Sequence, residues 1–345
     1  MSSHSRFRID LKTILITGVA GFMGSHLADA FIAKNYSVIG IDNLIGGYKE
    51  NVPSKVEFHC IDLDDFEAIK PIFEGVDLVL HAACTAYEGL SVFSPALVVR
   101  NTTQITVNVM SACINAKVPK IVYLSSMARY GSQDILPFTE DMIPNPQDPY
   151  GIAKYSSELL IKNIAQTHDM KYVILVPHNI IGPRQKFNDP FRNVASIMIN
   201  RILLGKPPII YGDGTQMRCF SFMDDVTNPV IRACEDNAVE GLTVNVGPDE
   251  EFITINDLAK TISSLMDSNL KPIYVTGRPQ EVKNANCSAD LARKLLAYET
   301  STSLEMGLRS LISYIREKGP REFDYHLPLE ITNEKTPKTW TEKLI

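Results

Sequence analysis

The chain has 345 residues, 45% of them hydrophobic and 21% charged, which is enough apolar surface for one large core or two domains. This composition excludes a disordered or collagen-like protein. The formal net charge of −6, without any run of Lys and Arg, argues against a nucleic-acid partner or an acidic membrane surface.

The six cysteines are scattered and form no CxxC pair and no Cys/His cluster with metal-ligand spacing. We therefore expect reduced, mostly buried thiols and no bound metal. Residues 1–11 are polar and lack the apolar core of a secretory signal, and no segment reaches the roughly 18 apolar residues that cross a bilayer. These features predict a cytosolic protein without a membrane partner.

Short β-branched runs alternate with longer helical patterns in the first half of the chain. The runs predict strands at 13–17, 37–42, 56–61, 76–81, 120–125 and 172–176. Strands that are apolar throughout and separated by helices are typical of a parallel sheet that is covered on both faces. The sequence therefore predicts an α/β fold with a Rossmann-type doubly wound parallel sheet, formed mainly by residues 1–178.

Beyond Pro177 the pattern becomes less regular. Short strands and Pro/Gly turns alternate with helices expected near 191–204, 225–235, 255–266, 288–296 and 303–317. We predict a smaller α/β domain formed mainly by residues 179–318, with scope for a strand or helix to return to the first domain. From Gly319 the periodic apolar pattern of helices and strands is lost and prolines become frequent. We expect residues 319–345 to form an extended tail packed on the body.

A glycine-rich turn follows the first predicted strand and leads into a helical pattern. Gly18, Gly21 and Gly24 would allow a tight turn, close approach of backbone to a pyrophosphate, and close packing of helix on strand. The second strand ends in Asp42, near the spacing of about 20 residues expected for an acid that binds the adenosine ribose. Because this carboxylate would repel a 2′-phosphate and no Arg follows it, the predicted cofactor is NAD rather than NADP.

A second group of residues opens the helix predicted after Asp148-Pro149, an N-cap followed by proline at the first helical position. Tyr150 and Lys154 are four residues apart and share one helical face. A tyrosine whose pKa is lowered by that ammonium and by a cationic nicotinamide can take a proton from a hydroxyl as hydride leaves its carbon. Ser126, at the carboxyl end of the fifth strand, would share that proton.

These motifs resemble the extended short-chain dehydrogenase/reductases, in particular the branch of NAD-dependent nucleotide-sugar epimerases and dehydratases, and most of all its UDP-glucose 4-epimerase-like members. The likeness extends from about residue 13 to residue 314. It rests on the segments Thr17 to Gly24, Asp42-Asn43, Asp62-Leu63, His81 to Ala83, Asn101, Ser125 to Gly131, Tyr150 to Lys154, Pro177 to Pro183, Gly212 to Arg218, and Arg278 to Glu281.

The resemblance implies a role for each matching residue. Catalysis would fall to Ser126, Tyr150 and Lys154. Besides Tyr150 and Lys154, NAD would contact Gly18, Gly21, Phe22, Met23, Gly24, Asp42, Asn43, Asp62, Leu63, Ala82, Ala83, Asn101 and Pro177. The nucleotide sugar would be held by Ser126, Asn179, Arg218, Arg278 and Glu281, the last in place of the usual aspartate. The family also implies a homodimer formed through the helices near 101–116 and 150–166.

Some positions depart from the family pattern. Cys219 stands where aspartate is common, and Val176 stands where arginine often precedes the proline of the sixth strand. The loop from Cys84 to Glu88, after the fourth strand, is also unusual. Because this loop should face the sugar, the identity of the sugar stays open, as does that of the nucleotide.

Three functions remain open at this level. The first is C4 epimerisation of a nucleotide sugar, such as a UDP-hexose or UDP-hexuronate, through a transient 4-keto sugar. The second is a 4,6-dehydratase or decarboxylase, which is disfavoured because Met127 and Ala128 replace the acids that such relatives carry beside the catalytic hydroxyl. The third is a non-catalytic NAD sensor or scaffold, which is disfavoured because Ser126, Tyr150 and Lys154 are all present.

Overall fold

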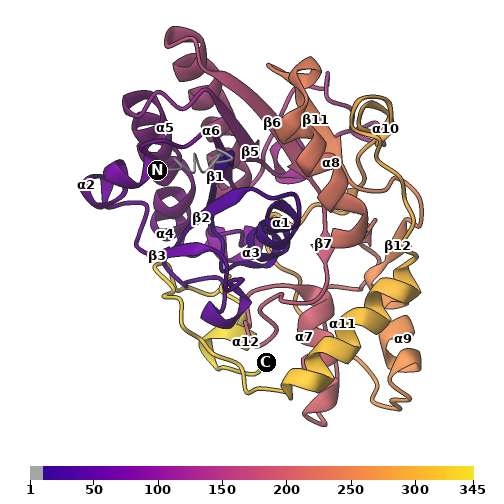
Figure 1. Cartoon of the computed structure of the whole chain (residues 1–345). Coiled ribbons are helices and arrows are strands. Elements are labelled where there is room, and N and C mark those ends of the chain that lie inside the picture. The colour runs from indigo at the N-terminus through magenta and orange to yellow at the C-terminus, as the bar shows by residue number, and fades with distance from the viewer. Residues whose placement is uncertain (1–10) are drawn as a thin grey trace, which may run out of the picture.

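A computed structural model describes residues 11–345 (Figure 1). At its centre is a seven-stranded sheet with the order β11-β6-β5-β4-β1-β2-β3, in which every neighbouring pair is parallel. The strands are β1 (Thr13–Thr17), β2 (Ser37–Asp42), β3 (Glu57–Cys60), β4 (Leu78–His81), β5 (Lys120–Leu124), β6 (Lys171–Pro177) and β11 (Thr243–Val246). The predicted doubly wound α/β fold is confirmed.

Helices cover both faces of this sheet. One face carries α1 (Phe22–Ala33), α8 (Met223–Glu235) and α10 (Asp290–Leu296), and the other carries α2 (Phe66–Ile69), α5 (Ile105–Asn115) and α6 (Pro149–Thr167). Ile14 and Ile16 of β1 pack on the first face, while Leu15 packs on the second. Burial on both sides explains why the strands are apolar throughout. Among residues 11–345, no helix is both long enough and apolar enough to cross a membrane.

The seventh strand comes from far along the chain. β11 pairs with β6 over Thr243 to Val246, at the edge of the sheet. The helix α8, which precedes it, packs against α1. The sequence analysis leaves room for a strand or helix to return to the first domain. The sequence does not identify β11 as that element, because a short apolar run has the same pattern in either domain.

The second part of the molecule is built on α7 (Val194–Leu203), α9 (Ile255–Leu265) and α11 (Leu304–Lys318), which share one apolar cluster. Its strands form three small sheets. These pair β7 (Ile180–Ile181) with β10 (Ser221–Phe222), β8 (Ile209–Tyr211) with β13 (Ile273–Val275), and β9 (Met217–Arg218) with both β12 (Ile253–Thr254) and β14 (Asn284–Ala285).

The tail, residues 319–345, lies along the body and is seen in yellow in Figure 1. It is mostly extended, but Lys338–Thr341 forms the short helix α12, where the sequence analysis expects extended chain. Trp340 packs edge-on against Phe93 and Phe191, with ring centroids 5.9 and 5.3 Å apart. The helical turn lets Thr339 and Trp340 both be buried, whereas an extended chain would point them to opposite sides.

Candidate active site

A cavity of about 420 Å³ lies at the carboxyl ends of β1, β2, β4, β5 and β6, and the second half of the chain forms its other wall. The predicted site residues line it with one exception, Gly24. Those that line it are Gly18, Gly21, Phe22, Met23, Asp42, Asn43, Asp62, Leu63, Ala82, Ala83, Asn101, Ser126, Tyr150, Lys154, Pro177, Asn179, Arg218, Arg278 and Glu281.

The glycine turn leaves bare backbone beside the cavity. Gly18 has φ +73°, and a Cβ on it would lie 2.9 Å from the backbone of Ala83. A Cβ on Gly24 would lie 2.1 Å from the Gly18 carbonyl oxygen, so Gly24 permits the close packing of α1 on the glycine turn. Helix α1 begins at Phe22 beside the cavity, where its first N–H groups suit a pyrophosphate.

Asp42 is fixed at one end of this cavity. Its carboxylate accepts hydrogen bonds from the N–H groups of Ala20 (2.9 Å) and Leu44 (2.7 Å). Burial raises the pKa of Asp42 above its ordinary value, and these N–H groups oppose the rise. Nearby, the Asn43 amide donates to Asp62 at 3.1 Å. A carboxylate held in this way can accept from the hydroxyls of an adenosine ribose.

We expect the protein to bind NAD about 100-fold more tightly than NADP, because the 2′-phosphate would meet the Asp42 carboxylate at short range. Asp42→Asn should narrow that ratio. Titration of both nucleotides by calorimetry checks this, with Asp64→Asn as a control that removes an exposed carboxylate outside the cavity. Equal affinity of the wild-type protein for the two nucleotides would contradict the role of Asp42.

A chain of buried side chains fixes the turn after β4. The Thr17 hydroxyl lies 2.7 Å from His81 Nδ1 and accepts from the N–H groups of Ala82 and Ala83 at 3.1 and 3.2 Å. His81 Nε2 lies 3.0 Å from the Thr106 hydroxyl. Burial lowers the pKa of His81 to about 3, so the ring is neutral at physiological pH. These bonds hold the two alanines against the glycine turn, where a flat cofactor ring can lie.

Asn101 offers an unused amide to the cavity. It lies in a π-helical turn, Arg100–Gln104, and its side chain is buried. Neither Oδ1 nor Nδ2 has a hydrogen-bond partner among residues 11–345. Because buried amides are normally paired, the two atoms suit a polar ligand group. Together with the bare glycine turn and Asp42, this amide fits a dinucleotide such as NAD.

The helix α6 carries the predicted catalytic pair. Asp148 caps it by accepting from the Gly151 N–H at 2.9 Å, as the sequence predicts. Tyr150 is 5% exposed and Lys154 is 1% exposed. The Lys154 ammonium donates to the Leu124 carbonyl at 2.7 Å, which fixes its position beside the tyrosine.

The tyrosine environment differs from the expectation in one respect. Burial raises the pKa of Tyr150 well above its ordinary value, while Lys154 and Ser126 oppose the rise. Positive charges alone would lower the pKa of Tyr150, but desolvation raises it and is the largest contribution here. Burial thus favours the protonated phenol, whereas Lys154 and Ser126 favour the phenolate.

The two predicted anchor arginines differ in how their donors are used. The Arg218 guanidinium donates to the backbone carbonyls of Met217 (2.8 Å), Lys283 (3.1 Å) and Val282 (2.6 Å). It therefore holds the chain together as well as lining the cavity. Asn179 is engaged too, because its amide donates to the Cys219 carbonyl at 3.0 Å.

Arg278 keeps more of its donors free. Its guanidinium lies 4.9 Å from the centre of the Tyr211 ring and pairs with Glu281 at 2.9 Å. Its Nε is buried and has no partner among the described residues. Burial alone would lower the pKa of Arg278, but Glu281 raises it, so the side chain stays cationic. Of the two arginines, Arg278 is the better placed to bind a diphosphate.

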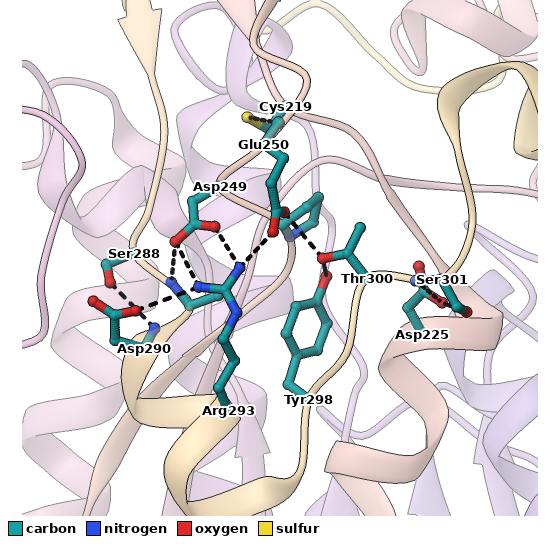
Figure 2. Close-up of polar contacts among 12 residues, drawn as sticks. Cys219, Asp225, Asp249, Glu250, Ser288, Asp290, Arg293, Tyr298, Thr300 and Ser301 are labelled. Carbon is teal, nitrogen blue, oxygen red and sulfur yellow. Dashed lines mark hydrogen bonds and ion pairs between the residues drawn. The ribbon is translucent and has the colours of Figure 1, made fainter.

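A polar network supports the strand that carries Arg218 (Figure 2). The adjacent Cys219 thiol donates to the Glu250 carbonyl at 2.9 Å. Arg293 of α10 pairs with Asp249 at 2.6 Å and with the Glu250 carboxylate at 2.7 Å. Burial alone would raise the pKa of Asp249, but Arg293 holds it below the ordinary 3.8.

Arg293→Ala should lower the free energy of unfolding by about 1–2 kcal/mol at pH 7, a modest value because the guanidinium is partly solvated. A carboxylate with a depressed pKa stabilises the fold above its unfolded pKa and loses that contribution as the pH falls through its folded pKa. The difference between variant and wild type should therefore shrink below about pH 4. Urea unfolding at several pH values checks this, with the exposed Arg309→Ala as control. An undiminished difference at pH 3 would contradict it.

The cavity also contains charged residues that the motifs do not identify. The Tyr87 hydroxyl donates to Asp189 at 2.5 Å, and the Arg192 guanidinium lies 5.6 Å from the Tyr87 ring centre. Glu88 and Asp148 line the same region. In the sequence, the unusual loop after the fourth strand points only to Tyr87 and Glu88, and Asp148 is noted only as a helix cap. Asp189 and Arg192 have no signal, because their approach to the loop depends on long-range folding.

Residues 14–247 match the NAD dependent epimerase/dehydratase family. The chain belongs to this family. The NAD dependence, the family and the extended short-chain dehydrogenase/reductase assignment predicted from the sequence are confirmed.

Among relatives in this epimerase family, a putative UDP-glucose 4-epimerase of Methanocaldococcus jannaschii is 33% identical over 308 residues, which cover 88% of this chain and 98% of the relative. The UDP-glucose 4-epimerase of Thermotoga maritima, solved with UDP-glucose, has a TM-score of 0.83 and 31% identity, covering 89% of this chain and 99% of that one. The UDP-glucuronic acid 4-epimerase of Bacillus cereus, solved with UDP-glucuronic acid and NAD, has a TM-score of 0.81 and 28% identity, covering 89% and 100%.

Proposed function

We propose that this enzyme is an NAD-dependent 4-epimerase of a UDP-sugar. One observation carries the proposal: a single cavity joins the glycine turn and Asp42, the buried group of Ser126, Tyr150 and Lys154, and the cationic Arg278. The names of the similar proteins support the choice of UDP and of position C4. The nucleotide-sugar epimerase predicted from the sequence is thus the function that the site supports best.

In the mechanism, Tyr150 takes the proton of the 4-hydroxyl, and Ser126 holds that hydroxyl in line with it. Lys154 stabilises the phenolate that Tyr150 needs for this role. Gly18, Asp42 and Asn101 would hold NAD, which would supply a reversible acceptor for the hydride of C4. The 4-keto sugar must present both faces, so its ring cannot be clamped. Arg278 therefore holds the diphosphate, which is remote from C4. Binding energy at the diphosphate does not hinder the rotation of the 4-keto sugar.

Incubation of the purified protein with NAD and a panel of UDP-, GDP-, CDP- and dTDP-sugars, followed by NMR of the products, tests this function. We expect the C4 epimer of a UDP-sugar with C6 intact. Loss of C6 as carbon dioxide would instead identify a decarboxylase. A 4-keto-6-deoxy product would identify a 4,6-dehydratase. Bound NAD without turnover of any sugar would replace it with the sensor.

The enzyme is proposed to be a homodimer through α5 and α6. On α6, Ile152 is 50% exposed and Leu159 is 49% exposed. Both side chains therefore present apolar surface to solvent in an isolated protomer. Leu159→Glu should convert the dimer to a monomer in sedimentation at micromolar concentration, because a carboxylate would be buried in the interface. The control is Met306→Glu, which changes a 60% exposed residue on α11. A wild-type monomer would contradict the proposal.

The domain boundaries predicted from the sequence also remain a proposal. We assign residues 1–178 mainly to the NAD-binding domain, although residues 1–10 lie outside the described part of the chain. Residues 179–318 are assigned mainly to the substrate domain, and residues 319–345 to the tail. Because α8 and β11 pack on the central sheet, we group them with the first domain. A cytosolic location is proposed as well, and the six unbridged cysteines support it.

A further inference from the structure

An acidic side chain that the mechanism above does not use borders the part of the cavity where the hexose must lie. Tyr150 reacts at the 4-hydroxyl and Arg278 binds the diphosphate, so the hexose spans the gap between them. Residues 84–89, which follow β4 and include the first residues of the helix α3 (Glu88–Ser91), all line the cavity. Glu88 is the one acidic residue among them.

Contacts of its neighbours Gly89 and Ser91 place the backbone of Glu88 between Arg278 and the helix that carries Tyr150. On one side is Arg278, because a Cβ on the adjacent Gly89 would lie 3.1 Å from its Nη1. On the other side is the helix that carries Tyr150. The Ser91 hydroxyl lies 2.6 Å from the Glu88 carbonyl and 3.4 Å from the carboxylate of Asp148, the N-cap of that helix.

The surroundings of Glu88 carry charges of both signs, because Arg218 and Arg278 interact with its charge and so does the Asp148 carboxyl. The Asp148 carboxyl is buried, and burial together with the Glu88 charge raises its pKa to about 7. Glu88 also contributes to the raised pKa of Tyr150. A further carboxylate brought into this gap would meet the same repulsion.

The cations that line the cavity each contact other groups of the protein, although Arg278 keeps donors free for the diphosphate and Arg218 donates to three backbone carbonyls. Arg278 is paired with Glu281, and Lys154 donates to the Leu124 carbonyl. Arg192 lies over the Tyr87 ring, and Lys186 Nζ is 3.2 Å from His326 Nε2.

We propose that Glu88 is a specificity-determining residue that selects sugars with a neutral group at C6, so that the substrate is a UDP-hexose and not a UDP-hexuronate. The inference rests on the proposed 4-epimerase function and narrows its substrate class. A hydroxymethyl group can donate a hydrogen bond to a carboxylate, whereas a uronate adds a second negative charge that has no proton to donate. The similar proteins include enzymes for both sugars, so the family alone does not decide between them.

The test compares kcat/KM for UDP-glucose and UDP-glucuronate in the NAD-loaded wild type, in Glu88→Gln and in Glu67→Gln. Gln keeps the size of the side chain and removes its charge, and Glu67 is an exposed residue of α2 outside the cavity. We expect the wild type to favour UDP-glucose by about 10–100-fold, and Glu88→Gln to raise kcat/KM for UDP-glucuronate about 10-fold, mainly through KM. Glu67→Gln should match the wild type. Equilibrium displacement of bound UDP by each sugar nucleotide gives the same comparison without turnover.

Two results would overturn the selection by Glu88 and leave the epimerase function standing. One is a wild type that epimerises UDP-glucuronate as well as UDP-glucose, and the other is a preference that Glu88→Gln does not change. If UDP-glucose and UDP-glucuronate bind with the predicted preference but neither is epimerised, the proposed reaction fails while the charge selection stands.

Discussion

Tyr150→Phe should lower kcat by about 10²–10⁴-fold and leave the Kd for the UDP-sugar nearly unchanged. The substitution removes only the phenolic oxygen, whose proton transfer belongs to the transition state, and the ring still fills its buried position on α6. Steady-state turnover by NMR and calorimetric titration of the UDP-sugar measure the two quantities separately.

The control for this variant is Tyr155→Phe, which removes the same atom from a tyrosine on the same helix that does not line the cavity. It should retain wild-type turnover. Turnover of Tyr150→Phe within about 10-fold of the wild type would show that another group moves the proton. A cellular function that survives the loss of turnover would favour the sensor over the enzyme.

Arg278→Ala should weaken UDP-sugar binding by about 1.5–3 kcal/mol, which is roughly 10–150-fold in Kd, with a smaller effect on kcat. The reason is that Arg278 brings donors to the cavity that the protein does not use, including its unpaired Nε. Calorimetry with the UDP-sugar and with UDP alone checks this. Both ligands should lose the same binding energy, because the arginine binds their common diphosphate.

Two further variants serve as a comparison and a control for Arg278→Ala. Arg218→Ala should weaken binding too, but it also leaves three backbone carbonyls without their donor, so we expect a lower free energy of unfolding in addition. Arg309→Ala removes an exposed arginine of α11 and should change neither quantity. Unchanged affinity in both Arg278→Ala and Arg218→Ala would refute the nucleotide-sugar assignment, even with NAD binding and the Tyr150 result intact.

Much of the cofactor half of the site could be predicted from the sequence, because its determinants are local. The glycine turn, the acid at the end of the second strand and the capped helix are each encoded by a few neighbouring residues. The structure places Gly18, Asp42, Tyr150 and Lys154 in one cavity through the parallel strands between them. Any doubly wound sheet brings the carboxyl ends of its strands to the same edge.

The tertiary structure alone decided the rest. Only the pairing with β6 shows that β11 joins the central sheet. Only the packing of α1 shows that Gly24 lies against the backbone of Gly18. Likewise, the sequence does not distinguish the roles of Arg218 and Arg278, and Glu88 belongs to no recognised motif. Their roles depend on which donors are already taken and which charges lie opposite, and both are set by residues far away in the chain. Local spacing encodes backbone conformation, whereas hydrogen-bond satisfaction and desolvation arise only when distant segments meet.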